Sequence, residues 1–357
     1  MLDKAGGHAG TGKESAVMLA AMLATGRVLL ADGATGTNLF ERGLMSGDSP
    51  ELWNDIHPDR IGALHREFVE AGADIILTNS FGANRRRLML HQLEERTREL
   101  NHLAVRHARA AAAHAGRPVI VAGSVGPTGD LLAPLGALTE DAAVAVFVEQ
   151  IEGLKQGGAD VVWIETMSAI EEIRAAARAA AICAMPYAVT ASFDTAGRTM
   201  MGILPARLIE FATALDPAPL GVGSNCGVGA TDLVASVLAL SAAAPEAVVI
   251  AKANCGIPRV TGAGTIYSGT PELMAEYTRL AIDAGARIVG GCCGTSPGHL
   301  AAMRAARDGH VRRARPDLDL LIARLGPLVS PPAKDGGDGP RRNARRRGTA
   351  GPDPSHA

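Results

Sequence analysis

The 357-residue sequence has few aromatic residues, no long apolar run and little net charge. Aromatic residues make up only 3% of the chain, so a ligand surface built mainly from aromatic rings is not expected. The chain lacks both an apolar run of membrane-spanning length and a basic-then-apolar signal at its start, which predicts no membrane association and a cytoplasmic location. The net charge of −2 indicates no polyanionic partner such as a nucleic acid.

Cysteine is also scarce, and its distribution is uneven. An odd number of cysteines, with two directly adjacent, is a poor framework for disulfides in a chain of this size. It fits metal binding or reactive thiols in a reducing compartment better. The five cysteines are Cys183, Cys226, Cys255, Cys292 and Cys293.

Composition divides the chain into one long central domain and two short ends. Hydrophobic residues make up 47% of the sequence, enough to bury a large core in one domain. We expect a partly disordered leader over residues 1–24, a single domain over residues 25–328, and a disordered basic tail over residues 329–357. The arginines between 341 and 347 are interpreted as part of a solvated tail rather than a nucleic-acid site.

Short apolar runs alternate with longer alanine- and leucine-rich stretches of helical period throughout the central domain. This alternation is typical of βα units with a parallel sheet, and eight such units predict a closed (β/α)8 TIM barrel. The runs are Val28–Asp32, Asp74–Asn79, Val119–Val125, Val161–Thr166, Tyr187–Phe193, Gly221–Cys226, Val248–Asn254 and Ile288–Cys292.

Polar and reactive residues gather where these runs stop, which is where barrel enzymes place their chemistry. Cys226 follows the sixth run, and Cys292 and Cys293 follow the eighth, so the three can converge at one rim. Three thiolates with an open fourth position predict a catalytic zinc site. Cys183 is interpreted as a small buried hydrophobe instead. Cys255, at the end of the seventh run, could be a ligand or lie just behind one.

The strand-end motifs resemble those of the homocysteine S-methyltransferase family. The resemblance extends from about Val28 to Met303, and the pairing of Asn-Cys with Gly-Gly-Cys-Cys is its most specific part. The motifs that carry it are Asp32–Thr37, Thr78–Phe81, Gly126–Thr128, Asn225–Cys226 and Gly290–Thr295.

The resemblance implies a barrel in which Cys226, Cys292 and Cys293 hold Zn²⁺ and serve as the catalytic residues. The open position would take the sulfur of homocysteine, because a coordinated thiol is deprotonated at neutral pH whereas a free thiol is mostly protonated. Methionine would be the product. A remote alternative is a zinc-binding barrel that is not an enzyme.

The same resemblance assigns the substrate-binding residues. Asp32 and Glu165 match carboxylates that hold the ammonium group of the substrate, although a helix cap and a structural ion pair are their respective alternatives. The carboxylate of the substrate would meet donors from one group of residues, and a second group would orient the site. The carboxylate donors are the backbone of Gly33 and the hydroxyls of Thr35 or Ser124; the orienting residues are Asn79 and Asn225.

The methyl donor is expected to be glycine betaine or a similar small onium compound. Trp53 is the best candidate for its recognition, since aromatic faces bind quaternary ammonium groups, whereas Phe81 and Tyr267 are interpreted as packed core aromatics. The alternative is the homocysteine-activating subunit of a split cobalamin- and methyltetrahydrofolate-dependent methionine synthase, with a corrinoid protein as partner, because the sequence shows no folate, cobalamin or activation domain. A homo-oligomer is compatible with either hypothesis.

Overall fold

Eight parallel strands form a barrel in the computed structural model, which describes residues 12–261 and 264–330. The strand order is β1-β10-β7-β6-β5-β4-β3-β2, and a bridge between Ala31 and Ile75 joins the two end strands. All eight runs expected from the sequence are strands, so the predicted (β/α)8 barrel is confirmed. Their bounds are β1 (Leu29–Leu30), β2 (Ile75–Leu77), β3 (Ile120–Val125), β4 (Val161–Met167), β5 (Tyr187–Ala191), β6 (Val222–Cys226), β7 (Val249–Ala253) and β10 (Ala286–Gly291).

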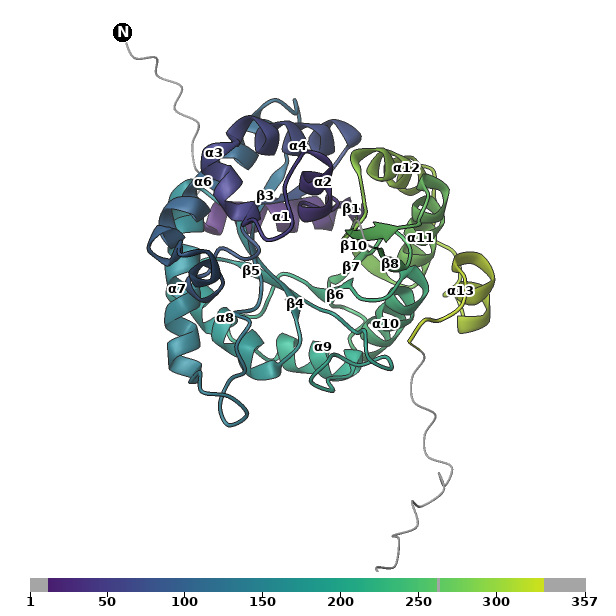
Figure 1. The fold of residues 1–357 in the computed structure, drawn as a ribbon. Helices are drawn as coiled ribbons and strands as arrows, with labels where there is room; N and C mark the ends of the chain where they lie inside the picture. The colour runs from purple at the N-terminus through teal and green to yellow at the C-terminus, as the bar shows by residue number, and fades with distance from the viewer. Residues whose placement is uncertain (1–11, 262–263, 331–357) are drawn as a thin grey trace, which may run out of the picture.

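Helices surround this barrel and cover its outer face (Figure 1). None of the helices in the described part of the chain is long and apolar enough to cross a membrane. The α-helices are α1 (Gly12–Ala24), α2 (Gly36–Glu41), α3 (Trp53–Ile56), α4 (Pro58–Ala71), α5 (Arg85–Leu88), α6 (Thr97–Ala113), α7 (Glu140–Gly157), α8 (Ile170–Ile182), α9 (Pro205–Thr213), α10 (Ala230–Ala243), α11 (Pro271–Asp283), α12 (Pro297–Asp308) and α13 (Leu318–Leu325). The short 3-10 helices are η1 (Pro50–Leu52), η2 (Met89–His91) and η3 (Glu94–Arg96).

A repeated Gly-Ala-Asp sequence sets two of the helix-to-strand junctions. Gly72 and Gly158 end α4 and α7 with φ angles of 109° and 93°, a left-handed conformation that glycine adopts without strain. The aspartates that follow accept a hydrogen bond from a neighbouring strand: Asp74 from the N–H of Leu30 and Asp160 from the N–H of Val121. The motif therefore ends a helix and fixes the start of the next strand against its neighbour.

One pair of strands lies outside the barrel and was not predicted from the sequence. Strands β8 (Pro258–Thr261) and β9 (Gly264–Tyr267) pair in the antiparallel direction. They fall between β7 and α11, so they lengthen the loop at the carboxyl end of the seventh barrel strand. This loop ends close to the cysteines that the sequence singled out.

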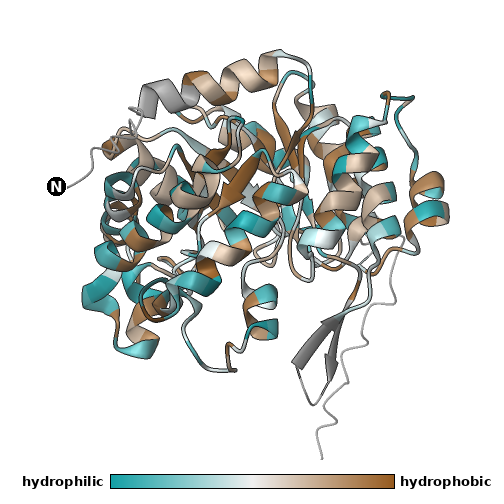
Figure 2. Ribbon diagram, turned by 90° about the horizontal axis from the view of Figure 1, so that it is seen from above, coloured by the Kyte–Doolittle hydropathy of each residue, from teal (hydrophilic) through white to brown (hydrophobic). Residues whose placement is uncertain are grey.

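The inside of the barrel forms a separate apolar core that α1 closes at one end. Leu19 and Leu23 of α1 are buried together with inward-facing strand residues such as Ile120 and Trp163. Figure 2 shows the helix nearest the N-terminus lying across one end of the barrel, with the hydrophobic strands next to it. The amino ends of the strands are therefore sealed, which leaves the carboxyl ends for a site. The leader expected over residues 1–24 contains this helix, and its first eleven residues, like residues 331–357 of the expected tail, lie outside the described residues.

We predict that Leu19→Ala lowers the free energy of unfolding by about 2–5 kcal/mol, because it leaves a cavity among the inward-facing strand residues. Leu19 is 1% exposed. Val17 on the same helix is 67% exposed, so Val17→Ala is the matched control and should change stability by less than about 0.5 kcal/mol. Urea denaturation of both variants measures the difference. Equal effects of the two substitutions would show that α1 does not seal the barrel.

Candidate metal centre

Three cysteine side chains meet at the carboxyl end of the barrel. The Sγ atoms of Cys226, Cys292 and Cys293 lie within 4.8 Å of one another, and those of Cys226 and Cys293 are 4.0 Å apart. Thiolates that bind one zinc ion tetrahedrally at about 2.3 Å lie about 3.8 Å from each other, so the spacing fits this metal. The strand order explains the meeting, because β6 and β10 both pair with β7. Among the described residues this is the one such cluster of potential metal ligands.

The backbone at Cys226 is turned so that its thiol reaches the cluster. Cys226 has a φ of 60°, which is unusual for a residue other than glycine and is found at functional sites. Thr166 at the end of β4 has a similar φ of 61°. Asn225 connects the two positions: its Oδ1 accepts from the N–H of Thr166, and its Nδ2 donates to the Thr166 hydroxyl and to Cys292 Sγ. Asn225 thus contacts both Thr166 and one cysteine of the cluster, and its role as an orienting residue stays a prediction.

Cys293 is held from behind by the loop that follows β7. The N–H of Cys255 donates to the Cys293 carbonyl, and Asn254 Oδ1 accepts from the Cys293 N–H. Hydrogen bonds from Cys226 and Cys292, with a further one from the Tyr267 hydroxyl, lower the pKa of Cys293, whereas the pKa values of Cys226 and Cys292 are raised. This thiol is therefore disposed to be a thiolate, as metal binding requires.

The other two cysteines lie outside the cluster. Cys255 is buried behind the ligands, and desolvation raises the pKa of its thiol to about 11. Of the two roles left open by the sequence, the structure supports the position just behind a ligand. Cys183 is buried at the end of α8, where it packs with the hydrophobic core, in agreement with its interpretation as a small hydrophobe.

A cavity of about 400 Å³ opens directly above the three cysteines. Of the eleven site residues predicted from the sequence, eight line it, and Asp32, Asn225 and Trp53 do not. Gly33 is required by its surroundings, since a Cβ there would come within 2.5 Å of the Thr295 carbonyl. The predicted residues that line the cavity are Gly33, Thr35, Asn79, Ser124, Glu165, Cys226, Cys292 and Cys293.

Glu165 is one of two carboxylates that line this cavity. Its Oε1 accepts a hydrogen bond from the Ser124 hydroxyl, so Ser124 holds Glu165 in place. Burial, followed by the nearby charge of Cys292, raises the pKa of Glu165 to about 7. A carboxyl group with such a pKa becomes fully ionised when a cation enters beside it, which suits it to bind an ammonium group.

Asp32 forms a buried ion pair that the sequence analysis missed. Its Oδ1 lies 2.9 Å from Lys252 Nζ, and its Oδ2 accepts from the N–H of Leu77. Burial raises the pKa of Asp32, while the charge of Lys252 acts in the opposite direction. Lys252 itself lines the cavity. A signal for it existed in the sequence, because a lysine inside an apolar barrel strand can be buried only with a partner.

The rim on the side of β2 is built from side chains that tie loops together. Glu51 accepts from the Gly82 N–H through Oε1 and from the Ser49 hydroxyl through Oε2. It lines the cavity, although no sequence motif singles it out. Asn79 donates to the Pro50 carbonyl and lines the cavity, and its orienting role stays a prediction.

The aromatic residues are placed differently from the sequence-based interpretation. Trp53 is 3% exposed and packs edge-on against His57, with the Arg60 guanidinium 5.0 Å from its ring centre. The Trp53 side chain does not line the cavity above the cysteines. Phe81 is 38% exposed and lines the cavity, so the packed-core interpretation of this residue was wrong: β2 ends at Leu77, and Phe81 lies in the loop beyond it.

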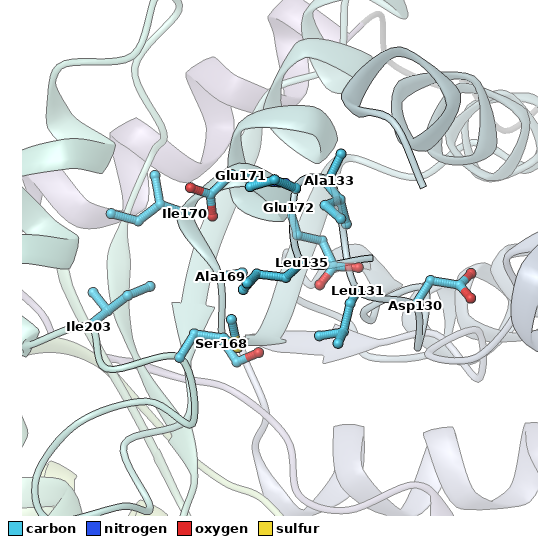
Figure 3. A pocket seen from close by; sticks show the side chains of 13 residues that line it. Asp130, Leu131, Ala133, Leu135, Ser168, Ala169, Ile170, Glu171, Glu172 and Ile203 are labelled. Atoms are coloured by element: carbon cyan, nitrogen blue, oxygen red, sulfur yellow. The ribbon is translucent and has the colours of Figure 1, made fainter. Parts of the chain in front are cut away.

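A second cavity, of about 350 Å³, lies between the loops after β3, β4 and β5 (Figure 3). Apolar side chains such as Leu131, Ile170 and Ile203 form its walls, together with carboxylates that include Glu172. Glu172 Oε1 accepts from both the N–H and the hydroxyl of Thr128, which fixes it as a loop brace. The two cavities share no lining residue, and the cysteines belong to the first alone.

The fold and site together define a class of protein. A (β/α)8 barrel with three thiols at its carboxyl end and a cavity above them has the arrangement of a barrel enzyme with a catalytic zinc site, because structural zinc sites are closed by a fourth protein ligand. The family profile described as Homocysteine S-methyltransferase matches residues 29–307. The chain therefore belongs to the homocysteine S-methyltransferase family, as its motifs predicted, and the tricysteine cluster has the composition and spacing of a zinc site.

Individual relatives agree with this assignment. The chain is 32% identical over 298 residues to the methionine synthase of Mycobacterium tuberculosis, a match that covers 78% of this chain and 24% of that protein. The methionine synthase of Mycobacterium leprae is also 32% identical, over 80% of this chain and 25% of that protein. The chain thus spans about a quarter of the length of the curated relatives it matches.

One solved structure superposes on this chain over nearly the whole of its own length. The metallated form of the homocysteine methyltransferase MmuM from Escherichia coli superposes with a TM-score of 0.68 at 26% identity, covering 80% of this chain and 99% of that chain. Its oxidised form superposes with a TM-score of 0.65 at the same identity, over 78% of this chain and 95% of that chain.

We predict that Cys226→Ser, Cys292→Ser and Cys293→Ser each abolish stoichiometric zinc binding, because two thiolates and a hydroxyl form a much weaker site. Cys183→Ser and Cys255→Ser should retain zinc, since neither thiol belongs to the cluster. Metal content measured by mass spectrometry after dialysis checks this. Full zinc retention in any of the first three variants, or its loss from Cys255→Ser, would refute the ligand set.

Glu165 generates a pH-dependent prediction for the zinc-free protein. Its pKa is about 7 when folded and 4.5 when unperturbed, so the wild type loses stability as the pH rises through this window. The loss amounts to about 3 kcal/mol at about 1.4 kcal/mol per pH unit. Glu165→Gln lacks the ionisation and should gain stability relative to the wild type by up to that amount between about pH 4.5 and pH 7. Urea denaturation at several pH values measures the difference, and a pH-independent difference would contradict the prediction.

Proposed function

We propose that this homocysteine methyltransferase forms methionine with glycine betaine, or a similar small onium compound, as its methyl donor. The observation that carries the proposal is the cavity above the tricysteine cluster, whose volume of about 400 Å³ falls within the range of small-molecule sites. Two phenylalanine rings, of Phe40 and Phe81, line the same cavity.

Homocysteine enters this cavity with its sulfur toward the cysteines. Cys226, Cys292 and Cys293 would hold zinc, which would bind the thiol of the substrate and keep it deprotonated at neutral pH. Glu165, held by Ser124, accepts hydrogen bonds from the ammonium group. The negative charge of three thiolates keeps the bound sulfur electron-rich, so no separate general base is needed during the transfer.

The donor enters from the open side of the cavity. Phe40 on α2 and Phe81 after β2 are 53% and 38% exposed, so their rings are available to a ligand. The face of an aromatic ring attracts a quaternary ammonium group, and such a contact contributes about 0.5–2 kcal/mol. These two rings take the part that the sequence analysis gave to Trp53, which is buried outside the cavity.

The reaction then needs only alignment of sulfur, methyl carbon and nitrogen. The sulfur of homocysteine attacks the methyl carbon, and the new S–C bond forms as the C–N bond of betaine breaks. The electron pair of that bond goes to nitrogen, which leaves as the neutral amine of dimethylglycine. The cavity holds the two reactants close together, which contributes to the rate by lowering the entropic cost of their encounter.

A second candidate donor is methylcobalamin presented by a corrinoid protein. The 32% identity with two methionine synthases favours it, because those proteins share this barrel region with the chain. In that case the exposed rim around the cavity would contact the partner, and betaine would not be turned over.

The donor experiment distinguishes the two. We predict that zinc-loaded protein with homocysteine forms methionine when betaine is supplied and forms none with free methylcobalamin under the same conditions. Methionine and dimethylglycine, measured together by mass spectrometry, should appear in equal amounts. Methionine formed with methylcobalamin alone would favour the second candidate instead.

The phenylalanines supply the matched variants. Phe40→Ala and Phe81→Ala should each raise KM for betaine by about 2- to 30-fold, the equivalent of a cation–π contact. KM for homocysteine should stay within about twofold in both, since neither ring touches the zinc ligands in the proposed arrangement. Phe211→Leu, on α9 away from the cavity, is the control. If neither ring substitution changed KM for betaine, the proposed donor site would be wrong.

A further inference from the structure

Lys252 is a buried basic residue near the carboxyl end of a barrel strand. It lies on β7, with Asn225 of β6 and Gly290 of β10 as its neighbours in register. Its side chain is 2% exposed and forms an ion pair with Asp32. Removing an ammonium group from water is costly unless its hydrogen-bonding capacity is used, so a lysine at this position requires an explanation.

Asp32 uses only part of that capacity. Lys252 Nζ lies 2.9 Å from Asp32 Oδ1 and 3.1 Å from the Asp32 carbonyl oxygen. An ammonium group has three protons, so one proton has no acceptor among the described residues. Lys252 also lines the cavity above the cysteines. The remaining proton is therefore available to a ligand in that cavity.

The cavity holds its charges in an arrangement that matches an amino acid. Lys252 is the single cationic side chain among the described residues that line it. Glu165 lies close enough for the charge of Lys252 to affect it, and its Oε2 has no hydrogen-bond partner in the described part of the chain. At neutral pH homocysteine carries one ammonium and one carboxylate, and these two side chains offer one partner for each.

We infer that Lys252 binds the carboxylate of homocysteine and that Asp32 is the residue that positions Lys252. Both carboxylate oxygens of Asp32 are already engaged, one by Lys252 and the other by the Leu77 N–H. Asp32 is thus better placed to hold the lysine than to receive the ammonium group of the substrate, the role expected from the sequence. The ammonium group then belongs to Glu165. This assignment concerns homocysteine alone and does not depend on the methyl donor.

A substrate that lacks the carboxylate tests the inference. We predict that Lys252→Met weakens binding of homocysteine to the zinc-loaded protein by about 10- to 100-fold, as expected when a charge-assisted hydrogen bond is lost. Binding of 3-aminopropane-1-thiol, which is homocysteine without its carboxylate, should change by less than about threefold. Isothermal titration calorimetry measures both dissociation constants without any methyl donor. Equal weakening for the two thiols, or none for homocysteine, would overturn the assignment.

Two further variants keep the test decisive. Lys252→Met leaves Asp32 buried without its partner and could unfold the chain, so the double variant Asp32→Asn/Lys252→Met removes both charges and should show the same loss of preference for homocysteine. Glu165→Gln is the matched control, because both thiols carry the ammonium group and should be weakened by similar factors. Zinc content must equal that of the wild type in every variant compared. A double variant that still preferred homocysteine as strongly as the wild type would disprove the inference.

Discussion

The site depends on one constraint, the pairing of β6 and β10 with the two edges of β7. This pairing aligns Cys226 and Gly291 with the same residue, Ala253. Cys292, the residue after Gly291, therefore lies at the same level of the barrel as Cys226. Cys226 lies 66 residues before the Cys292–Cys293 pair in the sequence, so only the strand pairing brings the three thiols together. The positive φ of Cys226 and the hydrogen bonds of Asn225 then orient the end of β6 so that the Cys226 thiol reaches the cluster. The metal centre is thus a product of barrel closure as much as of the cysteines themselves.

Burial of charge is the second determinant of the site. Asp32, Glu165 and Lys252 all lie at the carboxyl end of an apolar barrel, where an unpaired charge would be strongly destabilising. Lys252 compensates Asp32, while Glu165 responds to burial with a pKa of about 7. A zwitterionic amino acid supplies the missing partner for each of the two groups that face the cavity. Electrostatics therefore favours a ligand with both charges over a simple thiol.

The sequence predicted the parts of this structure that depend on local pattern. Each barrel strand is an apolar run, and each cysteine of the cluster stands beside glycine at a strand end, so both could be recognised without knowing the contacts. Lys252 and Glu51 could not be selected in the same way. Their roles arise only when β10 pairs with both β1 and β7, which brings Lys252 beside Asp32, and when η1 meets the loop after β2. The β8–β9 pair was missed because it is short and lies within a glycine-rich loop.

The two ends of the barrel separate stability from chemistry. At the amino end, α1 contributes Leu19 and Leu23 to an apolar core that needs no polar partner. At the carboxyl end, polar side chains use neighbouring loops and strands for their hydrogen bonds, and they leave a donor on Lys252 and an acceptor on Glu165 toward the cavity. Unused hydrogen-bonding groups at a buried position lower the free energy of unfolding. Burial of apolar side chains at the sealed amino end acts in the opposite direction. The residues that a ligand would satisfy are therefore those that the fold alone leaves incomplete.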